Sequence, residues 1–154
     1  MIKFSVARLE KEPISLSGSE APAFLDLPEG DVYEVVSDVT YDLQVNKVSG
    51  GALVSGSCRV TIAGTCGRCL SAVEQEVEAD GISLFFDLDE VGDEVDISED
   101  IRSELLLELP MILLCDEACR GLCPECGCDL NRETCSCGGP GGSLAWGELD
   151  KLDL

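Results

Sequence analysis

Seven of the ten cysteines of this chain lie within 23 residues, between Cys115 and Cys137. Hydrophobic packing does not explain this density, so the stretch must serve thiol chemistry or metal binding. Its segment Cys123-Pro124-Glu125-Cys126-Gly127 has the form of a zinc knuckle, in which a proline fixes φ between two sulfurs and a glycine turns the chain back. We expect Gly127 to have a positive φ and the turn to direct backbone N–H groups at the sulfurs, which favours thiolate ligands of a metal.

Eight of the cysteines form four close pairs, which predicts two four-sulfur sites. Cys135-Ser136-Cys137 follows the knuckle after a loop of eight residues, so one tetrahedral site closes within 15 residues. The pair in Cys66-Gly67-Arg68-Cys69 would form the second site with Cys115 and Cys119, and its metal would fasten the tail to the body of the fold by closing a long loop. A rival grouping is one site made by the two central pairs, Cys115, Cys119, Cys123 and Cys126.

We predict two zinc ions, with iron as the alternative metal, and eight ligands: Cys66, Cys69, Cys115, Cys119, Cys123, Cys126, Cys135 and Cys137. Cys58 falls on the apolar side of an alternating strand, so we interpret it as an inert core residue. Cys128 lies next to the knuckle but one position away from where a ligand is expected. We interpret it as a cysteine that does not bind the metal, or as a replacement for another ligand.

The charge of the chain argues against direct, non-specific binding of nucleic acid. There are 31 acids, 10 bases and no histidine, for a formal net charge of −21, whereas affinity for phosphate backbones comes chiefly from Lys and Arg. A basic partner fits this acidic protein better. The charged start of the chain predicts no secretory signal, and no apolar stretch predicts a membrane span, so we expect a cytoplasmic protein. In a reducing compartment, cysteines bind metal in preference to forming disulfides.

The pattern of apolar residues predicts an α+β fold built on an antiparallel sheet or partial barrel. Alternation over 39–45 and 53–62, with a turn at Ser49-Gly50-Gly51, indicates a long hairpin. Further strands are expected at 73–77 and 81–86, the latter from its β-branched and aromatic composition. Residues 1–30 are expected to contribute one edge strand, at 2–6, and loops.

One main helix is predicted at 98–109, capped by Asp96 or Ser98, with Ile101, Leu105 and Leu109 on its buried face. The acidic segment 87–100 before it is expected to be a solvated loop, with a contact surface for a basic partner as the alternative. The apolar run 111–114 is expected to be a buried strand or connector. We therefore predict a sheet body (1–114), a zinc-binding segment (115–137), and a Gly-rich tether with a short terminal helix (138–154) in which Trp146 docks on its own domain or on a partner.

No motif indicates a catalytic site. A catalytic zinc needs an open coordination position and usually a histidine or carboxylate base, and the chain has no histidine. The enzyme alternative is a thiol-disulfide oxidoreductase, because Cys66 and Cys69 have the thioredoxin spacing. A low thiolate pKa in that motif usually comes from a helix N-terminus, however, and here both flanks have the pattern of strands.

Several of these motifs together resemble the bacterial YceD family. They are Cys66-Gly67-Arg68-Cys69-Leu70 after a strand, Leu105 to Pro110 at the end of a helix, and the cysteine stretch with Cys119-Arg120-Gly121-Leu122-Cys123-Pro124-Glu125-Cys126-Gly127, Leu130-Asn131 and Cys135-Ser136-Cys137. The resemblance covers about residues 35–154. The family's cysteine pattern matches the eight predicted ligands and includes neither Cys58 nor Cys128.

The resemblance implies a non-enzymatic factor in large-subunit ribosomal RNA accumulation, whose partner is a ribosomal protein or a pre-ribosomal particle. The acidity of the chain indicates that contact with RNA goes through a protein or through a few arginines, Arg68, Arg120 and Arg132, which alternatively compensate the charge of the thiolates. Another possibility is an acidic chaperone for a basic ribosomal protein. The tail departs from the family pattern, because Gly139-Pro140-Gly141-Gly142 replaces the expected proline-arginine before the terminal helix.

Overall fold

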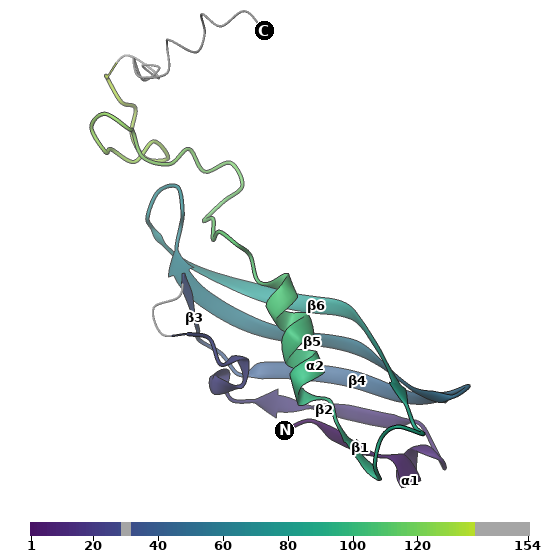
Figure 1. The fold of residues 1–154 in the computed structure, drawn as a ribbon. Coiled ribbons are helices and arrows are strands. Elements are labelled where there is room, and N and C mark those ends of the chain that lie inside the picture. The colour runs from purple at the N-terminus through teal and green to yellow at the C-terminus, as the bar shows by residue number, and fades with distance from the viewer. Residues whose placement is uncertain (29–31, 138–154) are drawn as a thin grey trace, which may run out of the picture.

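An antiparallel sheet of long strands forms the body of the molecule (Figure 1). The computed structural model describes residues 1–28 and 32–137. The central strand, β5 (Gly51–Thr65), pairs on one edge with β4 (Val39–Val48) and on the other with β6 (Ala72–Asp87). β2 (Ile14–Glu20) extends the sheet beyond β4, and β3 (Tyr33–Val35) pairs with the far end of β5. The predicted hairpin is confirmed, and so is the broad α+β class with a mostly antiparallel sheet.

Alternating side chains give this sheet one buried face. Leu43 and Val45 of β4 are buried, as are Val54 and Val60 of β5, while the intervening Gln44 is exposed. Cys58 lies on the same buried face, as the pattern predicts. Because the side-chain period of a strand is two, the apolar positions of these strands form a single continuous core surface.

β6 is one 16-residue strand, so the prediction of two separate strands at 73–77 and 81–86 is wrong. The buried positions change phase within it, from Val77 and Ala79 to Ile82. Gly81 causes the change, because the register jumps from Asp80 to Ile82 and leaves this glycine without a partner at φ 86°. A bulge of this kind inserts one residue and is accessible to glycine at positive φ.

The first 28 residues contain more structure than the sequence predicts. The expected edge strand is present as β1 (Lys3–Ser5), followed by α1 (Val6–Leu9), and a 3-10 turn, η1 (Pro22–Leu25), follows β2. β1 pairs with β7 (Glu94–Asp96), a short strand inside the acidic segment that was expected to be a loop. β2 was missed because its serines and glycine have low strand propensity, and its pairing with β4 overrides that preference.

The helix α2 (Ser98–Glu108) crosses one face of the sheet and covers the core (Figure 1). Its observed end is one residue before the predicted one. Ile101 and Leu105 are fully buried against the sheet, whereas Leu107 on the opposite side is exposed. Asp96 accepts a hydrogen bond from the backbone N–H of Ser98 at 3.0 Å, and the Ser98 hydroxyl accepts one from the N–H of Ile2 at 2.8 Å. The helix start is thereby joined to β1 and β7.

The connector 111–114 differs from its prediction. It is irregular, and Leu113 is its only fully buried residue; Met111 is 94% exposed and Ile112 63%. The Leu113 carbonyl accepts a hydrogen bond from the N–H of Gly67 at 2.8 Å. This contact places the start of the cysteine-rich segment beside the turn that holds Cys66 and Cys69.

Among residues 1–28 and 32–137, no helix has the length and apolarity that crossing a membrane requires. The predicted tether, the short terminal helix and Trp146 lie outside the described residues.

Candidate metal centre

The eight predicted ligands come together as two groups of four sulfurs, and within each group all sulfurs lie within 4.8 Å of one another. We call the first group the body site (Cys66, Cys69, Cys115, Cys119) and the second the knuckle site (Cys123, Cys126, Cys135, Cys137). This division is the one that pairing along the sequence favours. The rival grouping of the two central pairs is not formed in the described part of the chain.

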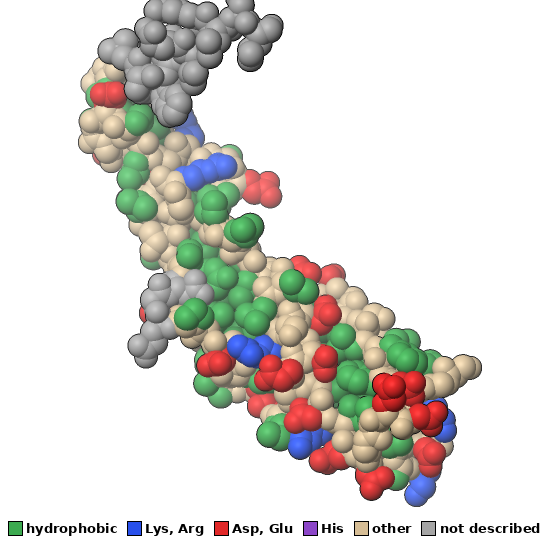
Figure 2. Space-filling model, in the orientation of Figure 1, with side chains coloured by type: hydrophobic (Ala, Val, Ile, Leu, Met, Phe, Trp, Pro, Cys, Tyr) green, Lys and Arg blue, Asp and Glu red, His purple; other side chains and the backbone are tan. Residues whose placement is uncertain are grey.

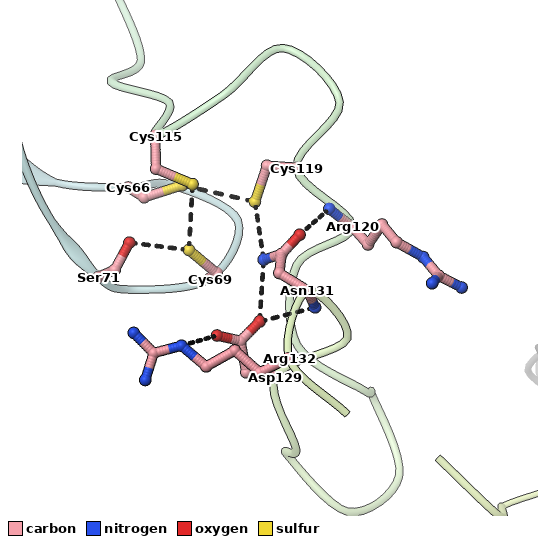
Figure 3. A network of polar contacts seen from close by, with 9 residues as sticks. All are labelled: Cys66, Cys69, Ser71, Cys115, Cys119, Arg120, Asp129, Asn131 and Arg132. Carbon is pink, nitrogen blue, oxygen red and sulfur yellow. Dashed lines mark hydrogen bonds and ion pairs between the residues drawn. The ribbon is translucent and has the colours of Figure 1, made fainter. Parts of the chain in front are cut away.

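The body site joins the sheet to the segment that follows the helix (Figure 3). Cys66 and Cys69 lie in the tight turn between β5 and β6, where the N–H of Leu70 donates to the Cys66 carbonyl at 3.0 Å. The connector returns Cys115 and Cys119 to this turn. The Sγ atoms of Cys69 and Cys115 are 3.5 Å apart, and those of Cys66 and Cys119 are 3.9 Å apart.

The knuckle site is local and more exposed. The Sγ atom of Cys135 lies 3.3 Å from that of Cys123 and 3.6 Å from that of Cys126. Gly127 has the expected positive φ, 75°, and its N–H donates to the Cys123 carbonyl at 2.8 Å. Cys123 is buried, whereas Cys126 and Cys137 are exposed.

The spacing of the sulfurs matches metal coordination and not disulfide bonding. Thiolates at about 2.3 Å from a shared tetrahedral zinc ion lie about 3.8 Å from one another. The four sulfur pairs described above are 3.3 to 3.9 Å apart, and every pair within a group lies within 4.8 Å. Bonded sulfurs would be about 2.05 Å apart, and all ten cysteines are free. Four cysteines also fill a tetrahedron completely, which is typical of structural zinc sites.

Backbone N–H groups point at the sulfurs in both sites. The N–H groups of Arg68, Glu125 and Cys137 each donate to the sulfur two residues earlier, at 3.5, 3.4 and 3.2 Å. Backbone hydrogen bonds, above all from Cys69, lower the pKa of Cys66 to about 6. Those from Cys128 lower the pKa of Cys126 to about 6. The turns therefore favour thiolates, the form that binds metal.

Contacts between neighbouring sulfurs raise the pKa of other cysteines in the two groups. The pKa of Cys115 is raised to about 12, mainly by its hydrogen bond to Cys69, and that of Cys137 to about 12, mainly by Cys135. Without a cation, Cys115 and Cys137 therefore keep their protons, and a bound metal would take the place of these protons. Cys58 is a different case, since burial in the core raises its pKa to about 11, in agreement with its interpretation as an inert residue.

The arginines near the sulfurs have distinct surroundings. Arg68 donates from Nη1 to the carbonyls of Glu117 at 3.1 Å and Cys119 at 3.0 Å, so it fastens the backbone between Cys115 and Cys119 to the turn between β5 and β6. Arg132 pairs with Asp129 at 3.5 Å. The guanidinium of Arg120 points away from the sulfurs in Figure 3. Arg68 therefore positions the backbone beside the body site. The sequence did not predict this role for Arg68.

Two polar side chains contact sulfur in a way that the sequence did not predict, although Asn131 belongs to the motif Leu130-Asn131 that supports the family resemblance. The Ser71 hydroxyl lies 3.0 Å from the Cys69 sulfur, and the Asn131 amide donates to the Cys119 sulfur at 3.4 Å. Ser71 lies two residues after a ligand, which is a weak signal. Asn131 is twelve residues from the sulfur that it contacts, so only the folded loop reveals it.

The oxidoreductase alternative receives no support from the local fold. Cys66 and Cys69 lie in a turn between two strands, without the helix N-terminus that activates a thioredoxin-type thiol. Cys66 is fully buried, and both sulfurs belong to a four-sulfur group.

Comparison with known proteins gives a family match for the C-terminal part of the chain. Residues 85–153 match the family model described as "Large ribosomal RNA subunit accumulation protein YceD". An uncharacterized protein of Mycobacterium tuberculosis is 38% identical over 106 residues, which cover 60% of this chain and 51% of that relative. One from Mycobacterium leprae is 33% identical over 113 residues, 64% of this chain and 52% of the relative.

A plant relative has a descriptive name. The "Large ribosomal RNA subunit accumulation protein YCED homolog 1, chloroplastic" of Arabidopsis thaliana is 41% identical over 59 residues, which cover 38% of this chain and 18% of the plant protein. This chain thus spans about half the length of the mycobacterial relatives and less of the plant one. No solved structure matches.

Proposed function

We propose that the chain, whose residues 85–153 match the YceD family model, is a zinc-stabilised accessory protein in the accumulation of large-subunit ribosomal RNA. In this proposal it acts as a binding module and not as an enzyme. The observation that supports it most directly is the gathering of eight cysteines into two complete four-sulfur groups. A zinc ion bound by four cysteines has no open position for substrate, so its role is structural.

We propose that each group holds one zinc ion and that the two ions stabilise the fold. The body site would fasten the zinc-binding segment (115–137) to the sheet body (1–114), and the knuckle site would fold the segment itself. When bound, zinc would supply four metal–sulfur bonds and compensate part of the thiolate charge. The N–H groups directed at the sulfurs, and the hydrogen bonds that Arg68 donates, would fix the ligand geometry.

The partner that best fits the surface is basic. On the face drawn in Figure 2, Asp and Glu side chains gather over the sheet body, and fewer lie on the cysteine-rich end. The formal charge of −21 repels phosphate backbones and attracts basic protein surfaces. We therefore propose that the protein meets a ribosomal protein or a pre-ribosomal particle in the cytoplasm through protein contacts.

Depletion of the protein from its host cell tests this function. We expect the amount of large-subunit ribosomal RNA to fall relative to small-subunit RNA, because the assembling large subunit loses a factor that it needs to persist. The measurement is the ratio of the two mature RNAs, with wild-type protein restoring it.

Two variants make the test specific to the metal groups. Cys66→Ser removes a body-site ligand and should fail to restore the ratio, whereas Leu107→Ala changes an exposed helix residue outside both groups and should restore it. An unchanged RNA ratio after full depletion would refute the proposed function.

A further inference from the structure

Asn131 connects the two cysteine groups. It lies in the loop between Cys126 and Cys135, which the knuckle site closes, yet its Nδ2 donates to the sulfur of Cys119 in the body site at 3.4 Å (Figure 3). No other side-chain amide of the described residues is shown donating to one of the eight sulfurs. A residue ordered by one site therefore contacts a ligand of the other.

The amide of Asn131 is held in one orientation. Its Oδ1 accepts the backbone N–H of Arg120 at 2.8 Å, and its Nδ2 donates to Asp129 Oδ1 at 2.8 Å as well as to sulfur. Asp129 also accepts the backbone N–H of Asn131 at 2.9 Å. Because an N–H can meet only the carbonyl oxygen of the amide, and a carboxylate only its NH₂ group, the two ends of the amide are assigned unambiguously.

The backbone of the same loop is attached to the wall of the body site. The N–H of Leu130 donates to the Gly121 carbonyl at 2.9 Å, and Leu122 forms a β-bridge with Asp129. Leu122 also donates its N–H to the Arg68 carbonyl at 3.2 Å and packs on the buried cluster of Cys66, Cys69 and Cys119. Folding of the loop around the knuckle therefore brings both Asn131 and Leu122 against the body site.

We propose that the two metal sites are thermodynamically coupled through Asn131, so that a metal in the knuckle site strengthens metal binding in the body site. The inference rests on the proposed metal binding. Four thiolates around a divalent ion leave a net charge of −2, and hydrogen bonds donated to the sulfurs stabilise it. The knuckle site supplies such a donor only when its loop is closed. Asn131 is thus a positioning residue for Cys119 and not a ligand.

The test is the rate at which each site loses zinc to a chelator in the full-length, metal-loaded protein. Newly freed thiols are alkylated and assigned by peptide mass, so Cys66 reports on the body site and Cys126 on the knuckle site. For Asn131→Ala we expect the body site to release zinc about tenfold faster than in the wild type. Loss of a residue that orients a metal ligand typically weakens metal binding by about 10- to 100-fold, and we expect the lower end of this range. Because thermodynamic coupling is reciprocal, zinc in the knuckle site should also be released faster once the coupling is removed.

Two further variants control for general disruption. Asn131→Asp keeps the size of the side chain and the acceptor for the Arg120 N–H but replaces the donor with a carboxylate, so body-site release should be at least as fast as in Asn131→Ala. Arg120→Gln alters a side chain that points away from the sulfurs and keeps the backbone donor, so it should behave like the wild type. Body-site release at the wild-type rate in Asn131→Ala, or an equal acceleration by Arg120→Gln, would overturn the proposal.

A double-mutant cycle tests the coupling itself. Cys135→Ser with Cys137→Ser disables the knuckle site and should also accelerate release from the body site; adding Asn131→Ala should then have little further effect, since the donor is already displaced. The coupling would be overturned if the effects of the knuckle variant and of Asn131→Ala on body-site release were additive, or if the knuckle variant left body-site release unchanged. Either result would leave the proposed function intact. A wild-type protein that holds no metal would instead refute the metal binding on which both rest.

Discussion

Removing the metal with a chelator is expected to unfold the segment 115–137 and to leave the sheet body folded. The core of the sheet and α2 contains none of the eight ligands, whereas the cysteines of the body site form a separate small cluster with Val73, Leu114 and Leu122. In the described part of the chain, residues 115–137 have no helix or strand beyond one isolated bridge. Without metal, such a segment has too little apolar burial to offset its conformational entropy.

Hydrogen exchange read by mass spectrometry measures this effect by region. Amides of 115–137 should lose protection after chelation, while those of the paired strands β4 and β5 keep it. Restoring zinc should restore protection, which serves as the control for irreversible damage. A metal-free chain in which 115–137 stays protected would contradict the prediction, and so would simultaneous loss of protection in β4 and β5.

Leu105→Ala is expected to lower the free energy of unfolding of the sheet body by about 2–5 kcal/mol, the range for truncating a fully buried leucine. Leu105 has no exposed surface and lies in the core between α2 and the sheet. The substitution removes buried apolar atoms and leaves a cavity that the long strands cannot close. Because domains are typically stable by only about 5–15 kcal/mol, the loss is a large part of the total. Urea denaturation of the metal-loaded protein, followed by circular dichroism, gives the value.

Leu107→Ala is the matched control, two residues along the same helix. Leu107 is 79% exposed, and the helix propensities of leucine and alanine are similar. Its free energy of unfolding should therefore stay close to that of the wild type. Equal destabilisation by both substitutions would mean that α2 does not pack on the sheet through the face described above.

The parts of the fold that the sequence predicts well are those with strict local patterns. The hairpin of β4 and β5 alternates without interruption around a glycine turn, and α2 has apolar residues at helical spacing after an acidic first turn. The grouping of the cysteines was also predictable, since close pairs along the chain tend to share a metal. These features depend on neighbouring residues, which a single sequence displays directly.

The features that were missed depend on distant residues. β2 is a strand because β4 lies beside it, not because its own residues prefer one. The continuity of β6 is hidden by one bulged glycine, and the exposure of Met111 depends on how the connector leaves the helix. Asn131 belongs to the same class, because its contact with Cys119 exists only after the loop has folded. Polar residues near a metal group are thus located by tertiary structure, while the ligands are located by sequence.

The central claim is that eight thiolates hold two ions in separate sites, and native mass spectrometry of the full chain tests it most directly. We expect the wild-type protein to contain two zinc ions, one for each four-sulfur group, and the single variants Cys66→Ser and Cys135→Ser to contain one each. A well-folded wild-type chain that contains no metal, or two ions that are both lost when either cysteine alone is replaced, would contradict the account.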